Sequence, residues 1–341
     1  MRGFGSDNHS GVHPAFLKAI AEANIDHAPA YGTDAWSEKL DKVIEKEFGK
    51  DAIAFPVFNG TAANVTSLRA LLRPYQAVLV TDCSHLNVDE CGAPEFMTGA
   101  KLIALPSENG KVSLATLKEH LIRRGDQHYS QVRGVSLTQP TELGTCYSVQ
   151  EIKEIVAWAR SEKLFVHIDG SRFANAATKL NLSLKELSTD LGVDILSFGG
   201  TKNGLMMGEL VIILNPAYAE DFKYIRKQSC QLPSKSRFIT AQFLTYFENE
   251  LWKQIASHSL KMADLLYQKL KTRTRLEIRT QPESNAVFAK IPQPWIKPLR
   301  ERFFFYVWDE KTFECRLMTS WDTSELDLEQ FVQLIEKQEK K

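Results

Sequence analysis

The segment that decides the fold is Val149–Ile168, whose sequence is VQEIKEIVAWARSEKLFVHI. In its first part, apolar side chains recur at Ile152, Ile155 and Val156, which is the spacing of one face of an α-helix. From Leu164 onward the segment is a short and mainly apolar run, which is typical of a buried strand. The segment therefore predicts an amphipathic helix that leads directly into a buried strand.

Similar apolar runs recur along the chain, and helical patterns separate several of them. We interpret seven runs as strands: Ala52–Val57, Ala77–Thr81, Leu102–Leu105, Val132–Leu137, Leu164–Ile168, Val193–Phe198 and Leu210–Leu214. Alternating strands and helices indicate an α/β fold, with a mostly parallel seven-stranded sheet and helices on both faces. Because such sheets bind ligands at the carboxyl ends of their strands, we expect the chemistry just after each run.

The character of the chain changes from about Asn215 onward. A long helical stretch, Ser236–Leu270, precedes a shorter tail with two further apolar runs, Asn285–Ile291 and Cys315–Ser320. A chain of 341 residues exceeds what one hydrophobic core usually organises. We therefore expect an N-terminal arm and large α/β domain over residues 1–240, and a small α+β domain over residues 241–341.

The overall charge points away from two classes of partner. The chain has 42 Lys and Arg residues and 42 Asp and Glu residues, so its formal net charge is zero. This balance gives no electrostatic reason to expect nucleic acid or an anionic membrane as the main partner. No stretch approaches the roughly 20 apolar residues of a spanning helix, and the polar N-terminus does not resemble a signal peptide.

The five cysteines are scattered, and they form neither a CxxC motif nor a Cys/His pattern with metal-ligand spacing. An odd number of cysteines in a chain without an export signal argues against a disulfide framework. We therefore expect a cytoplasmic protein with free thiols and no metal site.

The first predicted strand is followed by Asn59-Gly60-Thr61-Ala62-Ala63-Asn64, which runs straight into a helix. Small residues at a helix start expose backbone N–H groups to an anion, so Gly60 and Thr61 are candidate phosphate ligands. The same residues are also typical of an ordinary turn followed by a helix N-cap. This motif alone does not separate the two interpretations.

Two later runs also end in residues that could carry chemistry. Asp169 and Arg172 follow one strand, and Lys202 follows the next within a glycine-flanked loop. Each has an ordinary alternative, since Asp starts turns and Lys is usually solvated. Together, a phosphate loop, an acid and a lysine at successive strand ends are the set that pyridoxal phosphate (PLP) requires. The order of these motifs therefore favours a PLP site.

On these motifs and others along nearly the whole chain, the sequence resembles the threonine aldolase/β-eliminating lyase family of fold-type I PLP enzymes. The sequences of two of these motifs, Asp89–Phe96 after His85 and Ser197–Gly204 around Lys202, are most similar to the phenylserine aldolase branch. The matching motifs are Ser6–Asn8, Tyr31–Asp34, Asn59–Asn64, His85, Asp89–Phe96, Asp169–Ala176, Ser197–Gly204 and Arg316–Ser320.

The resemblance implies a role for each matching residue in the cofactor site. Lys202 would hold PLP as a Schiff base, Asp169 would pair with the pyridinium nitrogen, and His85 would stack on the pyridine ring. Gly60 and Thr61 would bind the phosphate. Lys227 matches a basic position near the phosphate that reaches across a subunit interface, so we expect a homodimer or homotetramer.

The resemblance also implies a substrate site. Arg172 and Arg316 match arginines that bind the substrate carboxylate, with Ser6 assisting them and Arg172 close to the cofactor. His128 matches a loop histidine near the substrate hydroxyl. The base that removes the hydroxyl proton stays open between His128, His85 and a water held by the phosphate.

The expected reaction is cleavage of an L-β-hydroxy-α-amino acid, such as threonine, allo-threonine or phenylserine, to glycine and an aldehyde. The family's tyrosine four residues after His85 is replaced here by Asp89, which puts the preferred substrate side chain in doubt. The alternatives are a β-eliminating lyase acting on another amino acid and a non-catalytic binding protein of the same fold. A nucleotide-binding dehydrogenase is disfavoured, because no GxGxxG follows the first strand.

Overall fold

The computed structural model describes residues 2–340, and within it all seven predicted strands form one sheet. The strands are β1 (Ile53–Val57), β2 (Gln76–Thr81), β3 (Lys101–Leu105), β4 (Gln131–Thr138), β5 (Phe165–Gly170), β6 (Ile195–Gly199) and β7 (Glu209–Ile213). Their order in the sheet is β1-β7-β6-β5-β4-β2-β3. Strand β7 is antiparallel to both of its neighbours, and the other pairs are parallel. The predicted mostly parallel sheet is confirmed.

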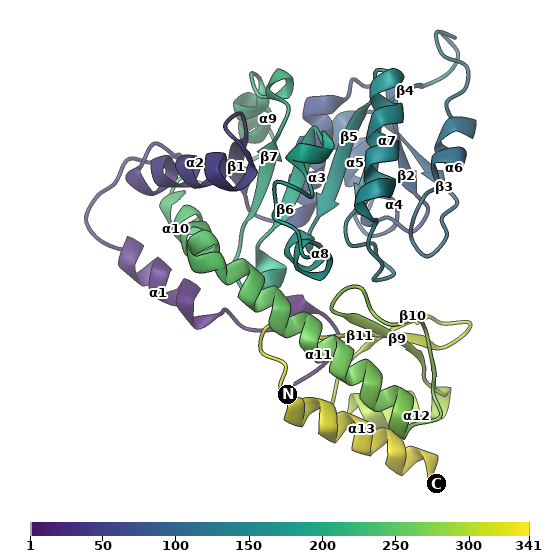
Figure 1. Cartoon of the computed structure of the whole chain (residues 1–341). Coiled ribbons are helices and arrows are strands. Elements are labelled where there is room, and N and C mark those ends of the chain that lie inside the picture. The colour runs from purple at the N-terminus through teal and green to yellow at the C-terminus, as the bar shows by residue number, and fades with distance from the viewer. Residues whose placement is uncertain (1, 341) are drawn as a thin grey trace.

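Helices cover both faces of this sheet, as Figure 1 shows. The helices of the large domain are α1 (Pro14–Ala23), α2 (Ala35–Phe48), α3 (Gly60–Leu71), α4 (His85–Val88), α5 (Ala93–Thr98), α6 (Leu114–Glu119), α7 (Val149–Ser161), α8 (Phe173–Leu180), α9 (Phe222–Gln228) and α10 (Arg237–Phe247). Helix α7, which was predicted from the opening segment, begins at a capping box formed by Ser148 and Glu151.

The alternation of side chains along β5 decides which face each residue serves. Val166 and Ile168 belong to the hydrophobic cluster that includes α7 and α8, whereas Phe165 belongs to the cluster that includes α3. Because successive side chains of a strand point to opposite faces, Asp169 shares the α3 face with Phe165. The catalytic candidate at the end of β5 is therefore directed toward α3.

A second, antiparallel sheet organises the C-terminal part. Its strands have the order β10-β11-β9-β8, with β8 (Glu277–Ile278), β9 (Ala286–Lys290), β10 (Tyr306–Asp309) and β11 (Glu314–Met318). Helices α11 (Leu251–Arg273), α12 (Gln293–Arg300) and α13 (Glu325–Glu339) complete this part. Both strands predicted in the tail, β9 and β11, pair with each other along their full length.

The predicted long helix over residues 236–270 is instead two helices. Asn249 and Glu250 both adopt left-handed backbone conformations, with φ of 50° and 53°. A left-handed residue cannot continue a right-handed helix, so the chain turns between α10 and α11. Figure 1 shows α11 running from the large sheet toward the small one.

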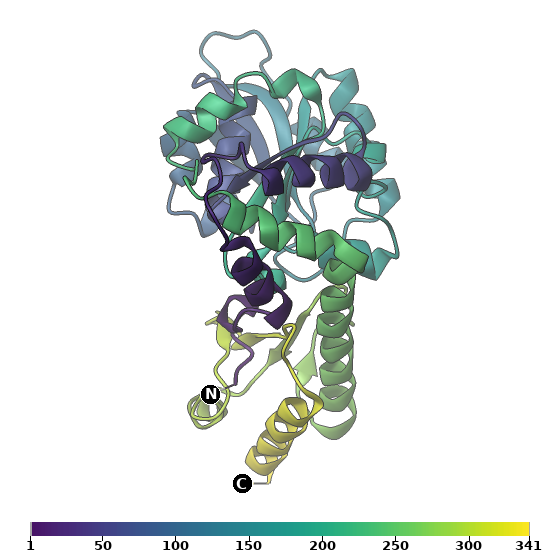
Figure 2. The same cartoon turned by 90° about the vertical axis from the view of Figure 1, so that its left-hand side faces the viewer.

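The N-terminal arm belongs to both parts of the molecule. Phe4 is buried in the hydrophobic cluster of the small domain, and Gly3 forms a bridge with Phe304. The chain then passes upward to α1 on the large domain, as Figure 2 shows. Along α11, Ala256 still belongs to the hydrophobic cluster of the large sheet, whereas Met262 belongs to that of the small sheet. The boundary at residues 240/241 stays a prediction, and we propose that the two bodies meet within α11.

Candidate active site

The functional candidates lie at one edge of the large sheet. His85 begins α4 after β2, Asp169 lies at the end of β5, and Lys202 lies just after β6. These strands are parallel, so their carboxyl ends share one edge, as expected. A cavity of about 150 Å³ opens there. Its lining includes the predicted residues Ser6, His85, Asp169, Arg172, Lys202 and Arg316.

Asp169 is a fully enclosed carboxylate held by several donors. Asn64 of α3 donates from Nδ2 to Asp169 Oδ2 at 2.8 Å. Ser171 donates to Oδ1 from its backbone N–H at 3.0 Å and from its hydroxyl at 2.8 Å. Burial raises the pKa of Asp169, but the charge of Lys202, the Asn64 hydrogen bond and the charge of His85 together hold the pKa below its ordinary value. Asp169 therefore stays ionised at neutral pH.

Lys202 lies in a single 3-10 turn, Thr201–Asn203, that follows β6. Burial lowers the pKa of its amine, and the nearby charge of Arg172 lowers it further. The carboxylates of Asp7, Asp169 and Glu209 act in the opposite direction but do not cancel the effect. The lower pKa increases the fraction of neutral amine, which is the nucleophilic form of lysine.

His85 is fixed by a buried carboxylate. Its Nδ1 lies 2.8 Å from Oε1 of Glu90, whose side chain is fully buried. The hydrogen bond to Glu90 raises the pKa of His85, and the negative charge of Asp169 adds to it against the effect of burial. The same Glu90 oxygen accepts a hydrogen bond of 2.9 Å from Asn64 Nδ2. His85, Glu90, Asn64 and Asp169 therefore form one connected polar network.

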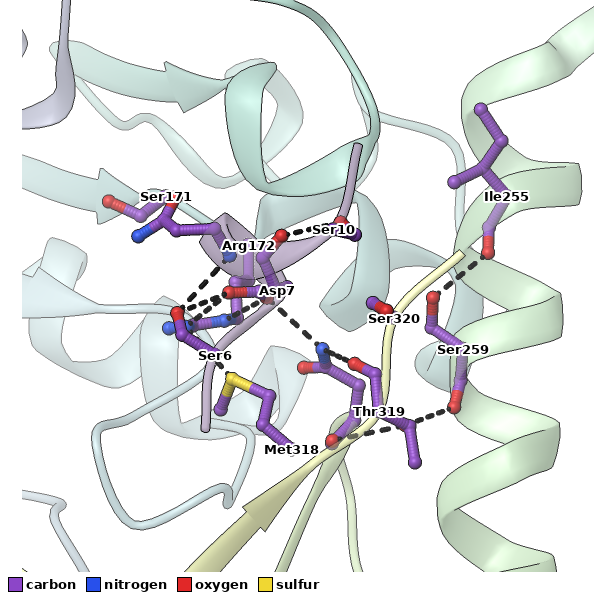
Figure 3. A network of polar contacts seen from close by, with 12 residues as sticks. Ser6, Asp7, Ser10, Ser171, Arg172, Ile255, Ser259, Met318, Thr319 and Ser320 are labelled. Atoms are coloured by element: carbon purple, nitrogen blue, oxygen red, sulfur yellow. Dashed lines mark hydrogen bonds and ion pairs between the residues drawn. The ribbon is translucent and has the colours of Figure 1, made fainter. Parts of the chain in front are cut away.

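The two arginines of the cavity differ in what holds them. Asp7 accepts from Nε of Arg172 at 2.7 Å and from Nη2 at 2.8 Å, as Figure 3 shows beside Ser6. Asn285 donates to the same carboxylate at 3.1 Å. Burial raises the pKa of Asp7 and lowers that of Arg172, but their pairing outweighs burial, so the pKa of Asp7 lies below its ordinary value and that of Arg172 above its own. Arg172 is therefore already paired within the chain.

Arg316 comes from β11 of the small domain, and its guanidinium lies 4.6 Å from the ring centre of Trp308. Its Nε is buried and has no hydrogen-bond partner among residues 2–340. Burial, together with the charge of Arg172, lowers the pKa of Arg316 to about 10. An unpaired, desolvated guanidinium in a cavity is suited to bind a carboxylate through two parallel hydrogen bonds.

The predicted phosphate turn begins helix α3. Asn59 caps the helix by accepting from the backbone N–H of Ala62 at 2.9 Å. Gly60 lies beside Ser171, since a Cβ atom added there would be 3.6 Å from the Ser171 hydroxyl. The helix start and the Asp169 loop are thus neighbours. The phosphate roles of Gly60 and Thr61 stay predictions.

Two predicted residues lie away from the cavity of their own chain. His128 is exposed in the loop between α6 and β4, where its backbone N–H donates to Asp126. Lys227 is exposed on α9, with its amine 5.2 Å from the ring centre of Tyr31. Neither lines the cavity, so their catalytic and phosphate-binding roles also stay predictions.

Four residues that complete the site were not predicted from the sequence: Asp7, Asn64, Glu90 and Glu142. Asp7 and Asn64 stand inside motifs that were quoted for their neighbours. Glu90 follows His85 by five positions on a short helix and turn, and nothing in that spacing specifies the contact between them. Glu142 follows β4, which ends without the small-residue loop that marked the other strand ends.

Three comparisons with known proteins identify the family of the chain. The model of the β-eliminating lyase family matches residues 3–293. The chain belongs to this family. A low specificity L-threonine aldolase from Pseudomonas aeruginosa is 40% identical over 324 residues, which cover 94% of this chain and 93% of that protein. One from a Pseudomonas species is 39% identical over 326 residues, which cover 94% and 93% of the two chains. The structure of a threonine aldolase from Leishmania major matches with a TM-score of 0.93 and 29% identity, covering 99% of each chain.

Membership of the β-eliminating lyase family confirms the fold-type I architecture and assigns PLP as the cofactor. The residues present fit that group. An ionised, buried carboxylate at Asp169 suits a protonated ring nitrogen, and a lysine with a lowered pKa at Lys202 suits bonding to an aldehyde carbon. Residues 2–340 contain no cluster of metal-ligating side chains and no helix able to cross a membrane.

Proposed function

We propose that this family member is a carbon–carbon lyase that cleaves L-β-hydroxy-α-amino acids to glycine and an aldehyde. Threonine, allo-threonine and phenylserine are the substrates that define the class. The observation that carries the proposal is the cavity that unites Lys202, Asp169 and the unpaired guanidinium of Arg316. Two relatives that are 39–40% identical and named low specificity L-threonine aldolases support the same reaction.

When bound, PLP supplies an electron sink for the bond that breaks at the substrate Cα. Asp169, whose carboxyl stays ionised, would hold the proton on the ring nitrogen that makes this sink effective. Lys202, with its lowered pKa, would hold the cofactor through its neutral amine. Their places at the edge of the sheet support both roles, and the pKa directions of these two buried groups agree with them.

Arg316 binds the α-carboxylate of the substrate. Its side chain lines the cavity, and its buried Nε has no hydrogen-bond partner among residues 2–340. Arg172 contributes its positive charge to the same cavity, while Asp7 keeps its orientation fixed. A carboxylate held in this way fixes the rotation of the substrate about Cα. That rotation determines which of the Cα bonds is placed for cleavage.

His85 is the less suitable candidate for the base that removes the β-hydroxyl proton. Its contact with Glu90 raises its pKa and therefore favours the protonated form, which cannot accept a proton. We propose that His85, held by Glu90, provides a ring face for the cofactor. Asp89, which lines the same cavity, is the residue through which we expect the substrate side chain to be selected.

A product panel tests the proposal. Purified protein loaded with PLP is incubated with L-threonine, L-allo-threonine and phenylserine, and aldehyde, glycine, 2-oxo acid and ammonia are measured. We expect glycine and aldehyde in equal amounts, with kcat/KM values that rank the three substrates. Ammonia and a 2-oxo acid in place of glycine (2-oxobutanoate from the two threonines, phenylpyruvate from phenylserine) would identify a β-eliminating lyase, and failure to bind PLP would indicate a non-catalytic protein.

Two lysine variants accompany the panel. Lys202→Ala is expected to lose turnover by at least about 10³-fold, since the nucleophilic amine is removed. Lys261→Ala removes an exposed lysine on α11 that pairs only with Glu325, and it is expected to retain wild-type activity. Full activity in Lys202→Ala would refute the assigned site. Light scattering of the same samples measures the expected dimer or tetramer, in which Lys227 would reach the partner's cavity.

A further inference from the structure

Glu142 lies in the cavity and has no role in the reaction described above. It follows β4, and its Oε1 accepts two hydrogen bonds: one from the backbone N–H of His85 at 2.8 Å and one from the hydroxyl of Thr138 at 2.9 Å. Thr138 is the register partner of Asp169 on the neighbouring strand. Glu142 is therefore held at the same edge of the sheet as the carboxylate of Asp169.

The second oxygen of Glu142 is unused. Its Oε2 is buried and has no hydrogen-bond partner among residues 2–340. Because Oε1 already accepts from two donors, a proton on this carboxyl is carried by Oε2. Burial raises the pKa of Glu142 to about 7, and the nearby charge of Asp169 contributes to this rise. The charged and titratable groups that line the cavity around it are His85, Asp89, Asp169, Arg172, Lys202 and Arg316.

Holding His85 does not require an acid. A glutamine would accept the same two hydrogen bonds at Oε1 without the cost of burying a carboxyl. Glu209 gives an instructive contrast, because its pKa is also raised to about 7 but its Oε2 accepts from the backbone N–H of Gly200 at 2.5 Å. When it carries the proton, Oε2 of Glu142 is thus a buried hydrogen-bond donor that has no acceptor among residues 2–340.

The topology of the sheet indicates which acceptor this is. Helix α3, whose first turn is the proposed phosphate site, packs on β5, β6 and β7, whereas Glu142 follows β4 on the other side of β5. In PLP the phosphate arm and the ring oxygen flank the aldehyde carbon on opposite sides. If the ring nitrogen lies at Asp169 and the phosphate lies toward α3, the ring oxygen would be directed toward β4 and Glu142.

We propose that Glu142 is a cofactor-binding residue, whose protonated Oε2 donates a hydrogen bond to the anionic ring oxygen of PLP. The inference rests on the proposed function only in requiring PLP in this cavity. It adds an acid–base group to the cofactor site, so that the charge of the ring oxygen is coupled to the proton of a protein carboxyl.

The test uses PLP-loaded protein without substrate, whose absorption spectrum is recorded from pH 5.5 to 9. We expect the wild type to show a spectral transition with a midpoint at or above about 7, as Glu142 loses its proton. Glu142→Gln keeps a neutral donor at the same position, so its spectrum should resemble the low-pH form of the wild type at every pH. Thr138→Val removes a donor to Oε1, so its midpoint should move to higher pH.

Two further measurements complete the test. Glu142→Ala is expected to weaken PLP binding by about 10- to 100-fold, which is the usual effect of losing a hydrogen bond to a charged group, whereas Glu142→Gln stays near the wild type. In the apoprotein at pH 6, the infrared C=O absorption of protonated carboxyls should lose one component in Glu142→Gln, whereas the component from Glu209, whose pKa is also raised to about 7, should remain. An unchanged infrared band, or a spectral transition retained in both Glu142 variants, would overturn the inference.

The outcomes also separate this inference from the proposed function. A wild-type protein that binds no PLP would overturn both. A wild type that binds PLP with the same affinity and spectrum as Glu142→Ala would overturn the role of Glu142 alone. Because no substrate is present, neither result depends on which amino acid the enzyme cleaves.

Discussion

Nδ2 of Asn64 lies 2.8 Å from Oδ2 of Asp169, so an amide on helix α3 holds the carboxylate at the end of strand β5. The same nitrogen donates to Glu90, which in turn holds the ring of His85. One amide therefore connects the carboxylate proposed for the cofactor's ring nitrogen with the histidine expected at its ring face. Asn64 is a positioning residue, since it acts through these neighbours.

Replacing Asn64 by alanine should weaken PLP binding by about tenfold, because Asp169 loses a donor that lowers its pKa. The dissociation constant of PLP, measured by fluorescence at pH 7.5, checks this expectation. Thr66→Val is the matched control on the same helix, since the Thr66 hydroxyl bonds only to backbone carbonyls of its own helix. Equal PLP affinity in Asn64→Ala and Thr66→Val would contradict the proposed role.

The buried Asp7–Arg172 pair predicts that a conservative substitution of Asp7 has a large effect on the stability of the protein. Asp7→Asn should lower the free energy of unfolding by about 3 kcal/mol, because it leaves a buried guanidinium without its carboxylate. It should also raise KM for the amino acid, since Arg172 loses its fixed orientation. Asp322→Asn disrupts the exposed pair with Arg2 on the same arm and should cost less than about 1 kcal/mol. Similar losses in the two variants would argue against a special role for the buried pair.

The stabilisation that the Asp7–Arg172 pair contributes should decrease as the pH falls. The pKa of Asp7 is lower in the folded protein than its unfolded value of about 3.9. The stabilisation is therefore fully present above the unfolded pKa and is lost as pH falls through the folded pKa. Urea unfolding of wild type and Asp7→Asn should converge below pH 4, and a constant difference down to pH 2 would contradict this.

His167 predicts a second acid-sensitive contribution at higher pH. Its ring is fully buried between the hydroxyls of Ser136 and Ser197, at 2.8 and 2.9 Å, and burial lowers its pKa from 6.5 to about 4. Below pH 6.5 the unfolded state gains a proton that the folded state does not, so stability falls by about 3 kcal/mol between pH 6.5 and 4.

The His167→Gln variant should show a smaller loss of unfolding free energy than the wild type over that pH window. His120→Gln serves as the control, because the ring of His120 is only partly buried and its Nδ1 lies 2.8 Å from the Thr116 carbonyl at the end of α6. If His167→Gln and the wild type lost equal free energy between pH 6.5 and 4, the buried neutral histidine would not be a source of acid sensitivity.

Gly199, which ends β6 just before the lysine loop, has no room for a side chain. A Cβ atom there would overlap the backbone carbonyl of Ser171, and backbone atoms cannot rotate away. Gly199→Ala should therefore cost at least about 3 kcal/mol in unfolding free energy and displace the Lys202 loop. Gly11→Ala, where a Cβ would meet nothing within 4 Å, should be nearly neutral. Wild-type stability in Gly199→Ala would show that the two loops separate easily.

The sequence predicted the sheet because each strand is a continuous apolar run, and it predicted Asp169 and Lys202 because they directly follow such runs. These are local signals that depend on spacing alone. The partners of these residues could not be predicted in the same way. Asn64 lies 105 positions from Asp169, and Asp7 lies 165 positions from Arg172, so only the folded chain brings them together.

The break between α10 and α11 was also missed, for a different reason. Asn249 and Glu250 adopt left-handed conformations within a sequence that contains neither glycine nor proline at the turn. Packing of α10 against α1 and α2 on the large domain and of α11 against α13 on the small one imposes the turn. Tertiary contacts, rather than local preference, decide the conformation there.

The bridge between the N-terminal arm and the small domain has a consequence for how the enzyme is made. Phe4 donates its N–H to Phe304 at 2.7 Å and accepts from Met318 at 2.8 Å, so the arm that carries Asp7 docks on strands near the far end of the chain. Residues 2–10 are synthesised long before residues 304–318, on which they dock. The large sheet can begin to fold during synthesis, but the arm can form these contacts only after the strands of the small domain have been made. The arm that carries Asp7 therefore docks late in folding, although it is made before every strand of the large sheet.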